Sequence, residues 1–189
     1  MANAAQVVFF GARRADGYSH VSQFISELGE HGSRDGFAVS WGAFAPVGAL
    51  VLAFALLVLP AFRGQRLAQV GLLVIGVSVA IGYVGSAAFR CDPGCPEMGG
   101  STTQEWHFIV SYVDYVGAAI GLGLCWYGLR ASERWSRLAR VALVGAVLVA
   151  ASGPVISSFD GTKGLTQRAI EVVIFGWPTL VAIAILRRG

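Results

Sequence analysis

Residues 67–89 read LAQVGLLVIGVSVAIGYVGSAAF and contain no Asp, Glu, Lys or Arg. An uninterrupted apolar block of about 20 residues matches the hydrocarbon thickness of a lipid bilayer when it is helical. In lipid, backbone amides must pair within their own segment or within a closed barrel. Barrel strands alternate between polar and apolar residues over about 10 residues, whereas this block is apolar on every face. It therefore predicts a transmembrane helix.

Further apolar blocks show the same pattern at residues 37–62, 107–127, about 138–156 and about 169–186. The chain is 55% hydrophobic and only 13% charged, against about 25% charged residues in a typical soluble domain. We expect an all-α transmembrane helical bundle with five visible spans. The bundle forms a single membrane domain over residues 1–189, in which residues 1–36 are an external segment with a short apolar start.

Basic residues are distributed unevenly between the two sets of connections. The turn after the first span, the loop after the third span and the C-terminus hold eight of the 14 Lys and Arg residues and one acid, Glu133. The connections on the other side hold the remaining six basic residues and eight of the 11 acids. Because Lys and Arg near span ends favour the cytoplasm, we expect a multi-pass cell-membrane protein with a cytoplasmic C-terminus.

The pI near 9.0 follows from these basic loops. No basic patch interleaved with aromatic residues occurs, which argues against nucleic acid as a partner. Membrane lipids are the expected partners.

Small residues recur at spacing four, as Ser78, Gly82 and Ser86 in the second span and as Gly117 and Gly121 in the third. Such rows permit close helix contact in lipid, so we expect the second and third spans to pack together, and the same chemistry permits a helix–helix oligomer.

Two cysteines lie four residues apart in CDPGCP, residues 91–96, within a loop that we expect outside the cell. Pro93 and Gly94 favour a tight turn, and disulfides persist outside the cytoplasm. We predict a Cys91–Cys95 disulfide, with two reduced thiols in a turn as the alternative. Cys125 lies within the third span and is expected to be a small buried hydrophobe.

The opening residues 4–12 are apolar but too short to cross a bilayer. They lack the basic region that begins a signal peptide. Our hypothesis is that they are the last turns of a truncated first span, in a protein that otherwise has six.

Several motifs, in their order along the chain, resemble a known membrane family. Residues 17–29 read GYSHVSQFISELG, residues 91–96 read CDPGCP, His107 opens the following span, and residues 164–168 read GLTQR. Over essentially the whole chain this pattern resembles the domain-of-unknown-function 998 family. The resemblance implies a six-span membrane bundle with the first motif just after its first span. It implies no activity.

Polar side chains are expected to gather at the outer end of the bundle and to form the candidate ligand-binding set. They come from the N-terminal segment, the third span and the fifth span, and they are Tyr18, Ser19, His20, Ser26, Glu27, His107, Ser111, Asp114, Gln167, Arg168 and Glu171.

Asp114 is the most demanding member of this set. It shares one helical face with His107 and Ser111 and lies about 10 Å deeper than His107. A carboxylate at such depth costs about 2.5–3.5 kcal/mol, so it should have a partner or be protonated. We expect Arg168 first and His107 second. Along the fifth span, we expect Glu171 to pair with Gln167 or Arg168.

Three functions remain open from these residues. The first is an outward-facing polar pocket, capped by residues 18–29, that binds a lipid headgroup or small molecule. The second is a membrane enzyme with His107 and Asp114, or His20 and Glu27, as acid and base. The third is a structural membrane protein whose polar network fixes the external segment on the bundle.

No phosphate-binding or dinucleotide-binding glycine motif occurs, so we expect no cofactor. His20, Glu27, His31 and His107 contain ligand types that zinc accepts, but their spacing matches no zinc motif. We therefore expect no metal.

Overall fold

The computed structural model describes residues 2–14, 17–97, 99–158 and 160–187. For residues 2–6, 153–158 and 160 the description covers the backbone only. Within these ranges the regular elements are all helical, with no strand among them.

The chain begins with the short helix α1 (Ala2–Ala12) and a 3₁₀ turn (Ser26–Gly29). The first span is composite and consists of α2 (Gly36–Val39), a π-helical turn (Ser40–Phe44), α3 (Ala45–Val58) and a 3₁₀ turn (Leu59–Phe62). The other spans are α4 (Arg66–Ala88), α5 (Thr102–Leu129), α6 (Ser136–Ser158) and α7 (Lys163–Leu186). Further 3₁₀ turns precede α6 (Glu133–Trp135) and α7 (Asp160–Thr162).

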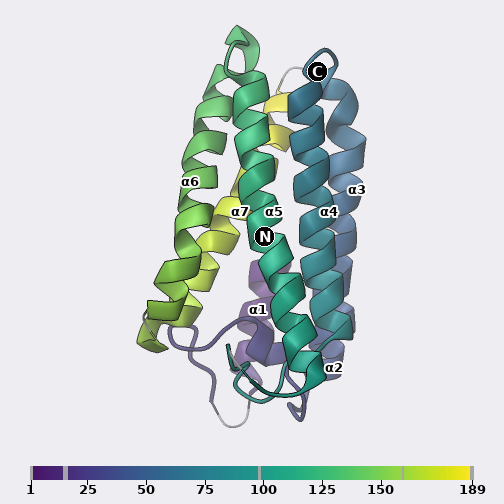
Figure 1. Cartoon of the computed structure of the whole chain (residues 1–189). Helices are drawn as coiled ribbons and strands as arrows, with labels where there is room; N and C mark the ends of the chain where they lie inside the picture. Colours follow the sequence, from purple (N-terminus) through teal and green to yellow (C-terminus); the bar gives the residue numbers. More distant parts are fainter. Residues whose placement is uncertain (1, 15–16, 98, 159, 188–189) are drawn as a thin grey trace.

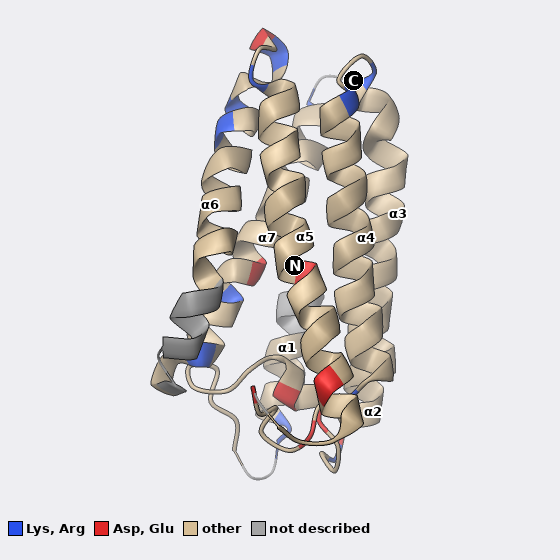
Figure 2. Ribbon diagram, viewed as in Figure 1, with Lys and Arg blue, Asp and Glu red and all other residues tan. Residues whose placement is uncertain are grey.

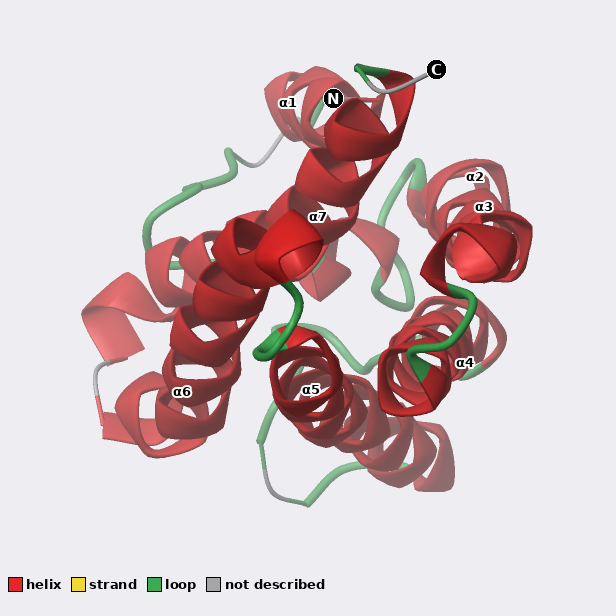
Figure 3. Ribbon diagram, turned by 90° about the horizontal axis from the view of Figure 1, so that it is seen from above, coloured by secondary structure: helices red, strands yellow, loops and turns green. Residues whose placement is uncertain are grey.

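Five helical stretches of the described chain are long and apolar enough to cross a membrane. This confirms the all-α bundle that the apolar blocks predict. The spans run alongside one another, and each packs against the next one in the chain (Figure 1). Seen along the bundle, their order follows the sequence from α3 to α7 (Figure 3). Helix α1 lies in the half of the bundle where α5 and α7 begin, and the C-terminus lies at the opposite end (Figure 1).

Helix α5 begins at Thr102, five residues before the start that hydropathy indicates, because polar caps fix its first turn. The Ser101 hydroxyl accepts a hydrogen bond from the backbone N–H of Gln104 at 3.2 Å. Ser101 in turn donates from its backbone N–H and its hydroxyl to the Asp92 carboxylate, at 2.7 and 2.8 Å. The helix has 28 residues, or about 42 Å, so it exceeds the roughly 30 Å hydrocarbon layer.

The π-helical turn in the first span lies directly before Pro46. Proline has no backbone N–H, and its ring crowds the preceding turn. A π-helical turn is a common local solution to such a defect in a continuous helix. The span therefore continues through Pro46 although its hydrogen-bond pattern changes there.

Helices α4 and α5 make the most extensive helix–helix contact of the bundle. The two backbones meet at glycines. A Cβ atom built on Gly121 would lie 2.5 Å from Ile75 Cγ1 and 2.7 Å from the Gly71 carbonyl oxygen, and one on Gly117 would overlap the Ser78 side chain. The predicted packing of the second span against the third is thus confirmed, and its physical basis is the small-residue rows.

The two ends of the bundle differ in charge. Lys and Arg dominate the end that holds the α3–α4 connection, the α5–α6 connection and the C-terminus (Figure 2). Most Asp and Glu residues lie at the other end, with the N-terminal segment and the connections before α5 and α7 (Figure 2).

A pair of glycine substitutions on α5 tests the α4–α5 contact. Gly121→Ala should lower the free energy of unfolding in detergent by about 1–3 kcal/mol, because its methyl group would overlap α4. Gly123→Ala is the matched control, since a Cβ there meets no atom within 4 Å. Because alanine favours helix over glycine by about 1 kcal/mol, Gly123→Ala should leave stability unchanged or raise it. Thermal unfolding of the purified variants measures the difference, and equal midpoints would contradict the close contact.

Candidate functional site

The N-terminal segment that the charge distribution predicts to be external, called the external segment below, folds across the ends of the spans where α5 and α7 begin and is fixed to α7 (Figure 1). The backbone N–H of Leu165 donates to the Val21 carbonyl at 2.9 Å. The backbone N–H of Ile25 donates to Gln167 Oε1 at 2.6 Å. Gly164 lies so close to the backbone of Gln23 that any Cβ there would overlap the Gln23 carbonyl oxygen. The GLTQR motif therefore serves as a docking face for residues 21–25.

Arg168 provides the strongest link between α7 and this segment. Its Nη1 donates to the carbonyl oxygens of His20 and Gln23, at 2.8 and 3.0 Å, and to that of Gly164 at 2.8 Å. Its Nη2 donates to the Tyr18 hydroxyl at 2.5 Å. The expectation that Arg168 pairs with Asp114 is wrong, because the carbonyls of the external segment occupy this guanidinium.

The acidic side chains of Glu27 and Glu30 in the external segment also have hydrogen-bond and ion-pair partners. Glu27 accepts from the backbone N–H of Phe24 and from Gln23 Nε2, both at 2.8 Å, and lies 3.7 Å from Lys163 Nζ. Glu30 pairs with Arg14 and accepts from the Gly94 N–H at 2.6 Å. These contacts connect α1, the external segment and the α4–α5 loop.

Cys91 and Cys95 form a disulfide, with Cα atoms 5.1 Å apart. The prediction from CDPGCP is therefore confirmed. His107 lies beside the two cysteines, with one ligand atom of each residue within 4.8 Å of the others. Its Nδ1 is 2.7 Å from the Phe89 carbonyl oxygen. With the sulfurs joined to each other, this group packs the loop against α5.

Among the described groups outside the spans, Tyr18, His20 and Asp92 have shifted pKa values. Burial raises the pKa of the Tyr18 hydroxyl, and the nearby Arg168 partly opposes that rise. Burial, together with the positive charge of Arg168, lowers the pKa of His20. The hydrogen bonds from the Ser101 backbone and hydroxyl lower the pKa of Asp92. A neutral His20 is thus favoured beside the Arg168 guanidinium.

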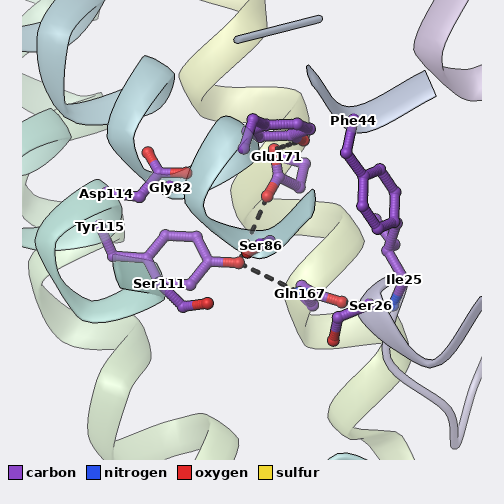
Figure 4. Close-up of a pocket in the computed structure, with 11 residues that line it drawn as sticks. Ile25, Ser26, Phe44, Gly82, Ser86, Ser111, Asp114, Tyr115, Gln167 and Glu171 are labelled. Carbon is purple, nitrogen blue, oxygen red and sulfur yellow. Dashed lines mark hydrogen bonds between the residues drawn. The ribbon is translucent and has the colours of Figure 1, made fainter. Parts of the chain in front are cut away.

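A polar cavity of about 40 Å³ lies deeper, between α4, α5, α7 and the external segment. Glu171 of α7 projects into the space among the three helices (Figure 4). Its carboxylate accepts hydrogen bonds from the hydroxyls of Tyr83 and Tyr115, at 2.8 and 3.3 Å. Gln167 Nε2 donates to the Tyr115 hydroxyl at 3.2 Å. The lining residues are Ile25, Ser26, Phe44, Gly82, Tyr83, Ser86, Ser111, Asp114, Tyr115, Gln167 and Glu171.

Asp114 differs from every acid above, because its Oδ1 is buried and has no hydrogen-bond partner among the described residues. The residue is only 5% exposed. It lies against Gly82, where a Cβ atom would be 2.5 Å from Asp114 Oδ2. The close approach of α4 thus holds the carboxyl at the cavity wall.

Residues 2–184 match the family described as "Protein of unknown function (DUF998)". The chain belongs to this family. Neither the curated proteins nor the solved structures contain a match to the chain. Membership of DUF998 confirms the resemblance carried by the GYSHVSQFISELG, CDPGCP and GLTQR motifs, and it assigns no activity.

The predicted site of this DUF998 chain divides into two parts. Ser26, Ser111, Asp114, Gln167 and Glu171 line the inner cavity. The others lie nearer the end of the bundle and form what we call the outer network. The external segment is held by Tyr18, His20, Glu27 and Arg168. Ser19 accepts from the Ser22 N–H at 3.2 Å, and His107 packs on the disulfide loop.

None of the proposed acid–base pairs is assembled. The His107 ring nitrogen contacts the Phe89 carbonyl oxygen rather than Asp114. The His20 ring packs edge-on against Tyr18, with centroids 5.0 Å apart, while Glu27 binds other groups. The local pairing of Glu171 with Gln167 or Arg168 is also wrong, because Tyr83 and Tyr115 hold its carboxylate.

Two tyrosines of the cavity were not among the candidates from sequence, although a signal for them existed. Tyr83 and Tyr115 lie inside apolar spans, where a buried hydroxyl needs a polar partner. Tyr83 also directly follows Gly82, and Tyr115 directly follows Asp114. Ile25, Phe44, Gly82 and Ser86 complete the set that the sequence did not assign to a site.

A second cavity, of about 370 Å³, lies between α1 and the turn before α2. Its lining includes Arg13 and Arg14. Arg13 Nε lies 3.3 Å from Asp35 Oδ2, and Arg14 pairs with Glu30. The charges of these two arginines are therefore balanced by acids within the same wall.

Loss of Arg168 should release the external segment. Arg168→Ala removes four hydrogen bonds to residues 18–23 and Gly164, so amide hydrogen exchange over residues 18–29 should become at least about tenfold faster. Arg137→Ala, which removes an exposed arginine at the other end, is the control and should not change this exchange. Unchanged protection in Arg168→Ala would contradict the anchoring role.

Proposed function

We propose that this chain is an integral membrane protein with an outward-facing polar pocket that binds a small molecule or ion, called the guest below. The observation that carries the proposal is the buried, unpartnered Oδ1 of Asp114 at the wall of a polar cavity. An unpaired polar atom away from water costs free energy unless a guest or water satisfies it. Such an atom within the span region is a functional-site signal.

The proposed guest enters from the acidic end of the bundle. Ser86 and Ser111 are half-buried and lie one turn outward of Gly82 and Asp114, on the side where the external segment lies. The distribution of Lys and Arg supports an external location for this end and a cytoplasmic C-terminus. Both serines thus line the proposed mouth of the pocket.

The cavity volume limits the size of the guest. Sites for drug-sized molecules occupy about 300–1,000 Å³, whereas this cavity has about 40 Å³. This volume favours a small polar guest over a complete lipid headgroup. A headgroup would require residues 21–27 to move away from α7.

The alternatives have less support from the geometry. The enzyme hypothesis needs a histidine beside an acid, and His107 and His20 each have other neighbours. The structural hypothesis describes the outer network well, because Arg168, Glu27 and Glu30 each bind neighbouring groups, although Arg168 Nε has no hydrogen-bond partner among the described residues. It leaves Asp114 without a reason to be buried.

Cysteine labelling from outside the cell tests the pocket and its orientation together. Ser111→Cys should react with a membrane-impermeant trimethylammonium methanethiosulfonate at least about tenfold faster than Val113→Cys, because a thiol facing lipid does not ionise. Val113 is on the same helix and is 37% exposed on the bundle surface. The unsubstituted chain, whose free Cys125 is buried, gives the blank.

Ala131→Cys, in the basic α5–α6 connection, should react only after the membrane is permeabilised. Equal rates for Ser111→Cys and Val113→Cys would contradict the pocket. Labelling of Ala131→Cys in intact cells would contradict the orientation.

A further inference from the structure

The hydrogen bonds around Glu171 suit an ionised carboxylate. Both oxygens accept, Oε2 from the Tyr83 hydroxyl and Oε1 from the Tyr115 hydroxyl. The Tyr115 hydroxyl itself accepts from Gln167 Nε2, so its own proton is directed at Glu171. A carboxylate is an acceptor at both oxygens, whereas a protonated acid must also donate. The cavity can therefore hold a negative charge at Glu171.

A second acid faces the same space. Asp114 is 5% exposed, and its Oδ1 has no partner among the described residues. Two carboxyl groups sharing a small buried cavity repel one another when both are charged. A positive charge between them would remove this repulsion.

The protein supplies no such charge at the cavity. Among the described residues that line it, none is Lys, Arg or His. The two nearest candidates in sequence are engaged elsewhere: Arg168 binds carbonyls of the external segment, and Lys163 lies beside Glu27. Either a proton on one of the two acids or a cation from solution must therefore relieve the repulsion, and the oxygen-lined cavity beside the unpartnered Asp114 Oδ1 favours a cation.

We infer that the cavity is a binding site for a hard metal cation, of the class of Na⁺ or Ca²⁺. This inference rests on the proposed function and names the guest of the same pocket. The side chains around the cavity offer oxygen ligands from carboxylates and hydroxyls, with Asp114 and Glu171 as the charged ligands and Ser86 and Ser111 as neutral ones (Figure 4). Hard cations prefer oxygen ligands.

The size of the cavity selects a metal ion over an organic cation. A volume of about 40 Å³ holds an ion with one or two water molecules. A lipid ammonium headgroup carries carbon and phosphate atoms that exceed it. Asp114 Oδ1, which has no hydrogen-bond partner among the described residues, would coordinate such an ion.

Cation-dependent stabilisation of the purified protein tests this inference. Thermal unfolding is measured in choline chloride and then with NaCl, KCl, CaCl₂ or ethanolamine hydrochloride at constant ionic strength. A cation that binds only the folded state raises the unfolding midpoint with its concentration. We expect NaCl or CaCl₂ to raise it above the choline and ethanolamine values. Calorimetric titration of the same ion should give a saturable heat.

Asp114→Asn should weaken binding of that ion by about tenfold or more, because it removes a charged ligand. Glu105→Gln is the matched control, since it removes an exposed acid from the first turn of the same helix, and it should bind as the unsubstituted protein does. Calorimetry on the folded Asp114→Asn variant separates lost binding from lost stability.

The inference is overturned if no metal ion exceeds the choline baseline, if ethanolamine alone does so, or if Asp114→Asn and Glu105→Gln bind equally. In each of these cases rapid external labelling of Ser111→Cys would still support the pocket, with water or an organic amine as its guest. Slow labelling would instead remove the proposed function itself.

Discussion

The cost of a carboxylate in hydrocarbon governs the interior of this bundle. Asp114 and Glu171 lie inside spans α5 and α7, where an isolated charge is unfavourable by several kcal/mol. Their burial against α4 is the consequence. Gly82 allows α4 to approach Asp114, and Tyr83 directs its hydroxyl at Glu171. The close α4–α5 contact thus both holds the spans together and keeps the Asp114 carboxyl group away from lipid.

Polar residues at the acidic end of the bundle divide by depth. In the layer nearer the end, Arg168 and Glu27 bind the external segment and Glu30 pairs with Arg14, although Arg168 Nε has no hydrogen-bond partner among the described residues. Such a network fixes a loop and leaves little capacity for a ligand. In the layer deeper in the bundle, Asp114 Oδ1 has no hydrogen-bond partner among the described residues and lies beside a cavity. The proposed binding function therefore belongs to this deeper layer, with the external segment as its cover.

Those features that depend on local sequence were predicted correctly. The apolar blocks give the five spans, because hydrocarbon thickness sets their length. The turn residues between Cys91 and Cys95 give the disulfide, since the two sulfurs are only four positions apart. The glycine rows give the α4–α5 contact. For α5 the prediction placed the start too late, because the polar cap at Ser101 extends the helix beyond its apolar part.

Pairings between distant residues were not predictable in the same way. Arg168 was assigned to Asp114 because an acid in a span needs a partner, but the choice depends on where residues 18–25 lie. Those residues bring a row of carbonyl oxygens to the guanidinium. Likewise, Tyr83 and Tyr115 could be assigned to Glu171 only after the rotation of α4 and α5 about their axes was known.

A crystal structure grown from a lipid mesophase, at a resolution that shows ordered solvent, measures the central claim most directly. The account predicts that Asp114 and Glu171 face one another across a cavity between α4, α5 and α7 that contains density for water or an ion within hydrogen-bonding or coordination distance of Asp114 Oδ1. A dry, closed interface at this position, or either carboxyl group turned outward to lipid, would contradict it.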